Sequence, residues 1–322
     1  MLITNIILSI FLLVATGYLL GYFKLVPVES AGPLMLYVFW AAVPAIVFST
    51  ISEYQLPEIF VWRFWVAYLL GILIITLVCY SIFRYFFSGT NQMSAIIAGF
   101  SATAKNTIMI GLPVLIGITG KKAVIPMAIT VIVFSCFIVP IIMFLFEINL
   151  HKEKNHAHAE GHILINSLVA TLKNPQVIAA ILGLIFSAFQ IPLPKFLKTL
   201  FEYFGQSIIP CALFAIGLSL VNTSIKGNIA KSLTVTFINL FICPCFAILL
   251  SYLLNLSPFY AVALVIFSSV PTAKIMYIYA SKYHFFEQET ATIISLTTIF
   301  SVLTIPLFIY ISSLLWPVVF HH

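Results

Sequence analysis

Two lysines lie inside long apolar runs, where charged side chains are rare. Lys105 belongs to SATAKNTIMIGLPVLIGITG (residues 101–120), and Lys274 belongs to SSVPTAKIMYIYA (residues 268–280). A lysine at the centre of a membrane helix costs about 2.5–3.5 kcal/mol on insertion scales, so each of them needs compensation. We expect both ammonium groups to face a water-filled site that receives an anion. The simpler alternative is that each long side chain extends to the membrane surface.

Both runs also carry residues that disturb a helix. Pro113 and Pro271 cannot donate a backbone hydrogen bond to the carbonyl four residues earlier, and Gly111 loosens the same turn as Pro113. One interpretation is an ordinary proline kink in each helix. The other is a pair of discontinuous helices whose positive N-terminal ends meet near the middle of the membrane and attract an anion together with the lysines.

Small polar residues next to the lysines could supply directional hydrogen bonds to such an anion. Asn106 could instead only satisfy backbone groups that the break leaves without partners. The candidate substrate-binding residues are Lys105, Asn106, Thr107, Gly111, Pro113, Ser269, Pro271, Thr272 and Lys274.

Other chemistries lack the residues that they need. The sequence has no Asp, and its nine Glu residues map to loops or to the ends of apolar runs. This argues against paired carboxylates for acid–base catalysis, a Na⁺ site or a conventional proton relay. The four His residues between 151 and 162 are more simply a solvated linker than a metal site, and the five Cys residues lie in apolar runs. We therefore expect no enzyme activity, no cofactor, no metal and no nucleic-acid partner.

The composition indicates that lipid is the main solvent of the chain. Of its 322 residues 62% are apolar and 7% are charged, against about 25% charged in soluble proteins. Apolar runs of about 18 to 27 residues suit helices that cross a bilayer. We expect an all-α polytopic membrane protein with ten spans, at residues 3–23, 31–51, 62–86, 92–118, 122–146, 174–191, 198–221, 230–254, 258–281 and 289–316.

The longest polar stretch divides these spans into five and five. The expected organisation is a first five-helix repeat (1–147), a His-rich linker (148–170) and a second five-helix repeat (171–322). Because five is odd, the second repeat enters the membrane in the opposite direction, as in many secondary transporters. The halves share Thr-Ala-Lys (103–105 and 272–274) and a Tyr seven residues before Pro44 and Pro210, which are candidate hinges.

Positive charges set the expected orientation. If the N-terminus is outside, the cytoplasmic segments hold eight Lys and Arg residues and the outer segments hold five. By the positive-inside rule we expect both termini outside and the His-rich linker in the cytoplasm of a cell with this protein in its plasma or inner membrane.

Several motifs together resemble the auxin efflux carrier family, which includes bacterial malonate and malate carriers. NTIMIGLPVL (106–115), LKNPQVIAAILGLIFSAFQIPLP (172–194), SIIPCALFAIGLSL (207–220), PTAKIMYIYASKYHF (271–285) and ETATIISLTTIFSVLTIPLF (289–308) are similar to its fourth, sixth, seventh, ninth and tenth spans. The resemblance implies two inverted repeats of five helices. Spans one, two, six and seven would form a scaffold, often dimeric, and the others a mobile transport domain. Spans four and nine would cross at Pro113 and Pro271, with the substrate carboxylate beside the crossing and Asn106 at the family's Asn position.

The resemblance implies an efflux carrier for small organic carboxylates, such as malonate, malate or auxin-like acids, that works by alternating access. Lys105 and Lys274 replace uncharged residues of the plant members, which favours a dicarboxylate over auxin. Two alternatives stay open: a Na⁺- or H⁺-coupled organic anion symporter of similar fold, and a membrane receptor that binds a carboxylate without moving it. A homodimer through the scaffold helices is a further expectation.

Overall fold

The computed structural model describes residues 2–54, 61–139, 141–142, 144–145, 173, 175–221 and 227–320. Within these ranges the chain is helical, and its only β-type pairing is an isolated antiparallel bridge between Lys105 and Thr272. The predicted linker 148–170 and the last two residues lie outside the described residues, as does part of the predicted span 122–146.

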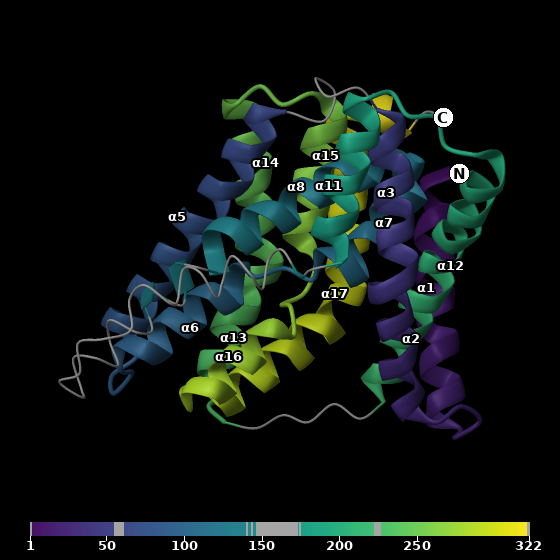
Figure 1. Cartoon of the computed structure of the whole chain (residues 1–322). Helices are drawn as coiled ribbons and strands as arrows, with labels where there is room; N and C mark the ends of the chain where they lie inside the picture. The colour runs from purple at the N-terminus through teal and green to yellow at the C-terminus, as the bar shows by residue number, and fades with distance from the viewer. Residues whose placement is uncertain are drawn as a thin grey trace.

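Helices occupy the apolar runs of the sequence (Figure 1). The α-helices are α1 (Leu2–Tyr22), α2 (Ala31–Tyr37), α3 (Val43–Glu53), α5 (Trp62–Phe86), α6 (Gln92–Thr103), α7 (Leu112–Thr119), α8 (Val124–Val133), α11 (Pro175–Ala188), α12 (Lys195–Leu220), α13 (Ile229–Phe237), α14 (Cys243–Leu253), α15 (Pro258–Ser269), α16 (Ile275–Tyr283) and α17 (Glu287–Leu315). Short 3₁₀ or π turns are η1 (Val28–Ser30), η2 (Val38–Ala42), η3 (Thr107–Gly111), η4 (Gly120–Ala123), η5 (Phe134–Ile138), η6 (Ile238–Ile242) and η7 (Pro317–Phe320).

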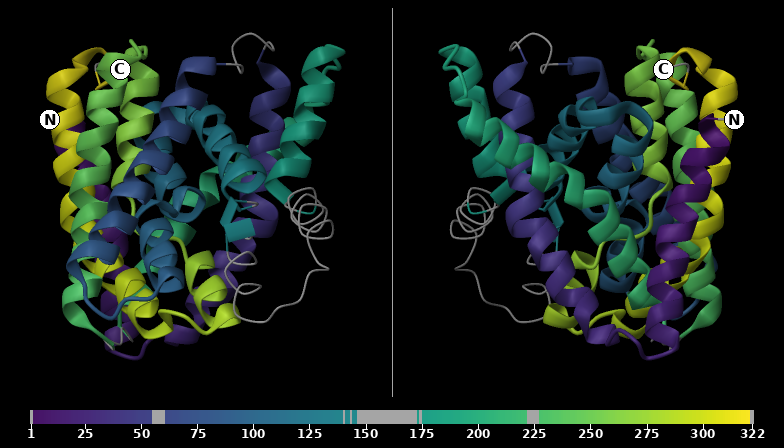
Figure 2. Two further views of the ribbon diagram at one scale, coloured as in Figure 1. Left: turned by 90° about the vertical axis from the view of Figure 1, so that its left-hand side faces the viewer. Right: turned by 90° about the vertical axis from the view of Figure 1, so that its right-hand side faces the viewer.

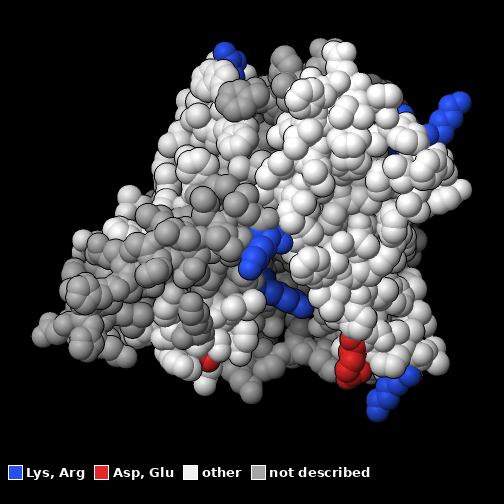
Figure 3. All heavy atoms as spheres, in the orientation of Figure 1, with Lys and Arg blue, Asp and Glu red and all other residues white. Residues whose placement is uncertain are grey.

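Six helical stretches of the described chain are long and apolar enough to cross a membrane: Val28–Glu53, Trp62–Phe86, Thr107–Val133, Lys195–Leu220, Ile229–Leu253 and Glu287–Leu315. Large apolar side chains, such as Leu77 and Leu303, are exposed on them. In Figure 3 the described surface is mostly uncharged; charged side chains lie toward its upper and lower ends, and some Lys or Arg side chains lie near its middle. The prediction of an all-α polytopic membrane protein is confirmed.

The helices form two neighbouring groups. In the first group, α1 packs along α12, α3 packs along α11, and α12 also contacts α2 and α3. The second group contains α5, α6, α13, α14, α15 and α17, which contact one another (Figure 1). Figure 2 shows that the two ends of the chain lie at the same end of the molecule.

A π turn precedes proline at four places. The turns η2, η3 and η6 are each followed, two residues later, by Pro44, Pro113 and Pro244, and the sequence has Pro140 at the same place after η5. Proline has no N–H and its ring clashes with the carbonyl four residues earlier, so the helix widens by one residue before it. The amides of Val43, Leu112 and Cys243 accordingly donate to the carbonyl five residues back.

This widening leaves one carbonyl per turn facing a proline that cannot donate. In η2 this is the Phe39 carbonyl, and the Gln176 side-chain amide of α11 donates to it at 2.8 Å. In η6 it is the Asn239 carbonyl, and the Lys105 ammonium donates to it at 2.7 Å. A side chain from another segment of the chain thus satisfies the backbone group in both places, as a lipid-embedded helix requires.

Close packing between α1 and α12 depends on small residues. A Cβ atom added at Gly217 would collide with the Val14 carbonyl and lie 2.8 Å from the Tyr18 amide. Small residues allow such close approach between membrane helices.

We expect Gly217→Val to destabilise the protein by about 1–3 kcal/mol, the usual cost of overpacking. The readout is the thermal unfolding midpoint of the purified protein in detergent. Gly32→Ala is the matched control, because a Cβ at Gly32 meets nothing within 4 Å. Equal midpoints for Gly217→Val and the wild type would contradict the close packing of α1 on α12.

Candidate functional site

Two interrupted helices cross in the interior. Helix α6 ends at Thr103 and the helix resumes at Thr107, while α15 ends at Ser269 and α16 begins at Ile275. The extended segments between them pair in antiparallel fashion: the Asn106 amide donates to the Pro271 carbonyl at 2.9 Å, and the Ala273 amide donates to the Ala104 carbonyl at 2.8 Å. Helix α6 has 12 residues and is therefore about 18 Å long, so the crossing lies roughly midway through a bilayer.

Side chains from other segments close the C-terminal end of α6. The Thr272 hydroxyl donates to the Ser101 carbonyl at 2.7 Å, and the Asn239 side-chain amide donates to the Ala102 carbonyl at 2.9 Å. The Thr272 amide in turn donates to the Thr297 hydroxyl of α17 at 3.2 Å. Carbonyls at a helix end have no intrahelical donor, so these bonds fix the crossing to η6 and α17.

Lys105 is buried at this closed end, with 8% of its surface exposed. Its ammonium donates to the Asn239 carbonyl, which Pro244 has left without an amide partner. The Cys243 thiol lies beside it and donates to the Ala102 carbonyl at 3.4 Å. No ion pair forms between Lys105 and any described carboxylate. A cation at a helix C-terminus is favourable, which helps to explain its position here.

The start of the next helix is open instead of closed. The π turn η3 and α7 together form a helix from Thr107 to Thr119, which ends where Gly120 takes a φ of 68°. Its N-cap, Asn106, makes no side-chain capping bond, and the amides of Thr107, Ile108 and Met109 have no acceptor among the described residues. The side chains of Asn106 and Thr107 likewise have no hydrogen-bond partner in the described part of the chain. These donors, at a positive helix end, form a place where a carboxylate could bind.

The two predicted lysines line different cavities. Lys105 lines a small cavity with Tyr68, Cys243 and Ser268 among others. Lys274 is exposed at the start of α16 and lines an open hollow with Tyr277, Ile278, Ala291 and Ile294. The expectation that both ammonium groups face one site is therefore not met in this structure. Successive residues of an extended segment point to opposite sides, so Lys105 and Asn106 also leave the crossing on opposite faces.

The crossing does not involve Pro113, which corrects the prediction. It forms at Lys105 and Thr272, and Pro271 contributes its carbonyl. Pro113 is the second residue of α7, where the preceding π turn accommodates its missing amide.

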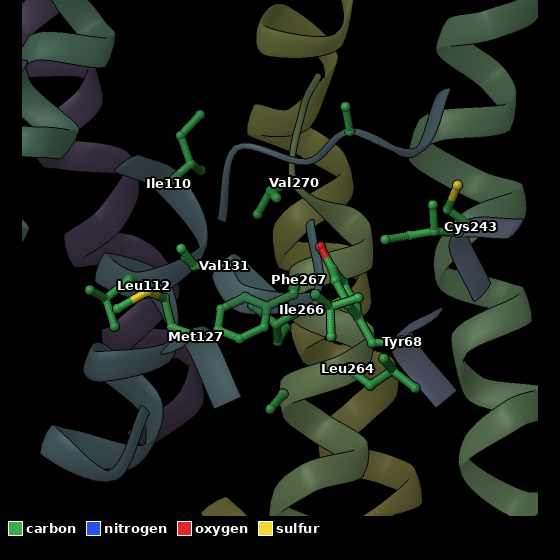
Figure 4. Packing of buried hydrophobic residues seen from close by; sticks show 14 of the residues in the cluster. Tyr68, Ile110, Leu112, Met127, Val131, Cys243, Leu264, Ile266, Phe267 and Val270 are labelled. Atoms are coloured by element: carbon green, nitrogen blue, oxygen red, sulfur yellow. The ribbon is translucent and has the colours of Figure 1, made fainter. Parts of the chain in front are cut away.

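Gly111 has a packing role in this turn. A Cβ there would lie 2.8 Å from the Phe267 ring. Figure 4 shows this ring between α15 and the neighbourhood of Leu112 and Met127.

The remaining candidates differ in how they are used. Ser269 is buried and donates to the Ile266 carbonyl of its own helix at 2.8 Å. Pro44 follows η2 in α3, and Pro210 lies within the continuous helix α12. Sequence reasoning missed Asn239 and Thr297. Asn239 carried a readable signal, because it is a polar residue in an apolar run five residues before Pro244.

We expect Lys105→Met to destabilise the protein by about 1–3 kcal/mol, because the buried Asn239 carbonyl loses its donor. Replacing Pro244 by Ala supplies an amide at the position that faces this carbonyl. The cost of Lys105→Met should therefore fall clearly in a Pro244→Ala background. Thermal unfolding of the wild type, both single variants and the double variant measures this. An equal cost in both backgrounds would contradict the pairing of Lys105 with the Asn239 carbonyl.

Comparison with known proteins identifies the family. Residues 2–309 match the family model described as "Membrane transport protein". The chain is 25% identical over 324 residues to a Rhizobium meliloti (strain 1021) protein named "Putative malonate transporter", covering 96% of this chain and 95% of the relative. It is 24% identical over 310 residues to a protein of Methanocaldococcus jannaschii named "Uncharacterized transporter", covering 94% and 96%. These similarities indicate a transporter and not an enzyme. The chain belongs to the membrane transport protein family, the auxin efflux carrier family that its motifs resemble.

Proposed function

We propose that this protein is a secondary transporter that moves small organic carboxylates, such as malonate or malate, across the cell membrane by alternating access. The observation that carries the proposal is the open helix start at the crossing. It gathers the amides of Thr107, Ile108 and Met109 and the side chains of Asn106 and Thr107, and none of these donors has an acceptor among the described residues.

A carboxylate fits these donors in charge and geometry. The N-terminal end of a long helix carries a partial positive charge, and its first amides point at a bound anion. Hydrogen bonds to a carboxylate are about twice as strong as those between neutral groups. One carboxylate group would accept from the backbone amides of Thr107–Met109, and the side-chain amide of Asn106 would fix its orientation.

The lysines would attract a substrate with more than one negative charge. Lys105 lies in the same extended segment as Asn106, so its ammonium adds positive potential from the opposite face. Lys274 would meet the substrate earlier, in its open hollow of about 410 Å³. The relative from Rhizobium meliloti, named for malonate, makes dicarboxylates the first substrates to test.

The helix contacts support a division into scaffold and mobile parts. In the proposal, residues 1–147 and 171–322 are inverted repeats, α1, α2–α3, α11 and α12 form the scaffold, and the remaining helices carry the crossing. A cavity of about 40 Å³ lies on the border, with Val14 and Leu213 on one side and Ile110 and Ser301 on the other. Movement of the crossing along this border would expose the crossing first to one side of the membrane and then to the other. A homodimer through the scaffold would hold the border in place.

Export needs no coupled ion in this proposal. An anion that leaves a negative-inside cell gains about 2.3 kcal/mol per charge for each 100 mV. The termini would lie outside, in agreement with the five outer against eight cytoplasmic positive residues. The sequence also lacks Asp, the usual ligand of a coupled cation.

Proton coupling is the second candidate, and one observation favours it. Lys105 is a buried amine whose hydrogen-bond partners are neutral, so it could release and rebind a proton as the crossing moves. In proteoliposomes, uptake or release that follows an imposed membrane potential at equal pH supports export without coupling. Flux that stops when the pH or Na⁺ gradient is removed supports the symporter.

We expect Asn106→Ala and Thr107→Val each to lower the kcat/KM of malonate or malate flux in proteoliposomes by about tenfold or more, since a hydrogen bond to a charged group contributes about 1.5–3 kcal/mol. Thr234→Val is the matched control, because Thr234 is half-buried in α13 and its hydroxyl donates to the Ala230 carbonyl of its own helix. Undiminished flux in both crossing variants would remove the open helix start from the binding site.

We expect Lys274→Met to raise KM while kcat changes little, because a residue at the entrance acts before the substrate is enclosed. Lys122→Met, at an exposed lysine in η4, is the control for the general effect of a lost surface charge on the rate at which the anionic substrate reaches the protein. A fall in kcat with an unchanged KM would place Lys274 in the moving step instead.

A further inference from the structure

The small cavity beside Lys105 is separate from the open helix start. Its walls come from α5, α14, α15 and the end of α6, and its polar lining consists of Lys105, Tyr68, Ser268, Thr103 and Cys243. The cavity measures about 30 Å³. One water needs roughly 10–15 Å³ by this measure, so the cavity accepts one or two waters or one monatomic ion and is too small for a dicarboxylate.

Several hydrogen-bond donors of the cavity lining have no acceptor among the described residues. An ammonium group has three N–H donors, and the Asn239 carbonyl takes one of those of Lys105. The hydroxyls of Tyr68 and Ser268 make no hydrogen bond with any described residue, whereas that of Thr103 is paired with Thr76 at 2.8 Å. Figure 4 shows the Tyr68 hydroxyl directed from α5 toward the space beside Phe267 and Val270.

The charge of the cavity is not balanced by the protein. Buried charges in proteins are paired, because an isolated charge in a medium of low polarity is very costly. The sequence has no Asp. The described ion pairs of its Glu residues involve Lys121, Lys198 and His284, and none involves Lys105. An anion of a size that the cavity can take would balance the charge of this ammonium.

We infer that this cavity is a binding site for a small inorganic monoanion, with chloride as the physiological ligand. The Lys105 ammonium would supply the charge, and the hydroxyls of Tyr68 and Ser268 would donate hydrogen bonds to the ion. Bound chloride would cancel the charge of Lys105, so chloride should also weaken carboxylate binding on the other face of the crossing. Only that last consequence rests on the proposed function.

The experiment is thermal unfolding of the purified full chain in chloride, bromide or methanesulfonate salts of equal ionic strength, without any transport substrate. We expect the unfolding midpoint to rise with chloride and bromide in a saturable manner, and not with methanesulfonate, which is too large. Ser268→Ala and Tyr68→Phe should each weaken the apparent chloride affinity by about tenfold or more, the fold-change for one lost hydrogen bond to an ion.

Lys105→Met should remove the chloride dependence, and Lys274→Met should retain it. If Lys105→Met does not fold, the hydroxyl variants decide, since each removes one donor and keeps the ammonium. A wild type whose midpoint is the same in all three salts overturns the inference. So does a chloride effect of unchanged affinity in the Ser268→Ala and Tyr68→Phe variants. Either result leaves the carboxylate site untouched, because the assay contains no carboxylate substrate of transport.

Discussion

Backbone groups that lose their partners inside lipid are the constraint on which this structure depends. Each break or widening of a helix leaves amides or carbonyls that water cannot reach. The chain satisfies some of them by pairing two extended segments at Lys105 and Thr272. It satisfies others with side chains, such as Gln176 and Lys105 on the carbonyls of Phe39 and Asn239. The prolines thus determine where one helix must be joined to another.

The same constraint makes the crossing asymmetric. The carbonyls at the end of α6 are closed by Thr272, Asn239 and the Ala273 amide. The amides at the start of the Thr107–Thr119 helix have no such closure among the described residues. The positive end of the next helix is therefore the open side of the crossing, and the proposal of a carboxylate substrate rests on this asymmetry.

Much of the fold could be predicted from the sequence, because hydropathy follows the lipid directly. The predicted runs 62–86 and 289–316 correspond closely to Trp62–Phe86 and Glu287–Leu315. The sequence predicts an interruption of the fourth span at Gly111 and Pro113, but the helix is interrupted at residues 104–106. Proline marks a disturbed helix, yet a π turn absorbed Pro113, and the break itself follows from pairing with a segment far away in the sequence. Local sequence signals do not reveal a pairing partner that lies far away in the sequence.

The residues of the candidate site could be predicted from the sequence, but the directions of their side chains could not. Lys105, Asn106 and Thr272 all lie at the crossing, as polar residues in apolar runs suggest. Lys105 points toward Asn239 and Asn106 points to the other face because the backbone between them is extended. The sequence alone predicts a helix here, and a helix would not separate the two side chains in this way. The packing of Phe267 against Gly111 belongs to the same class of tertiary information.

The central claim is that a carboxylate binds at the open start of the Thr107 helix. An experimental density map of the protein with bound malonate tests it most directly. The account predicts density for one carboxylate group within hydrogen-bond distance of the Thr107–Met109 amides and the Asn106 side chain, with the 105–272 bridge intact. Malonate bound elsewhere, with these amides capped by a protein group, would contradict it.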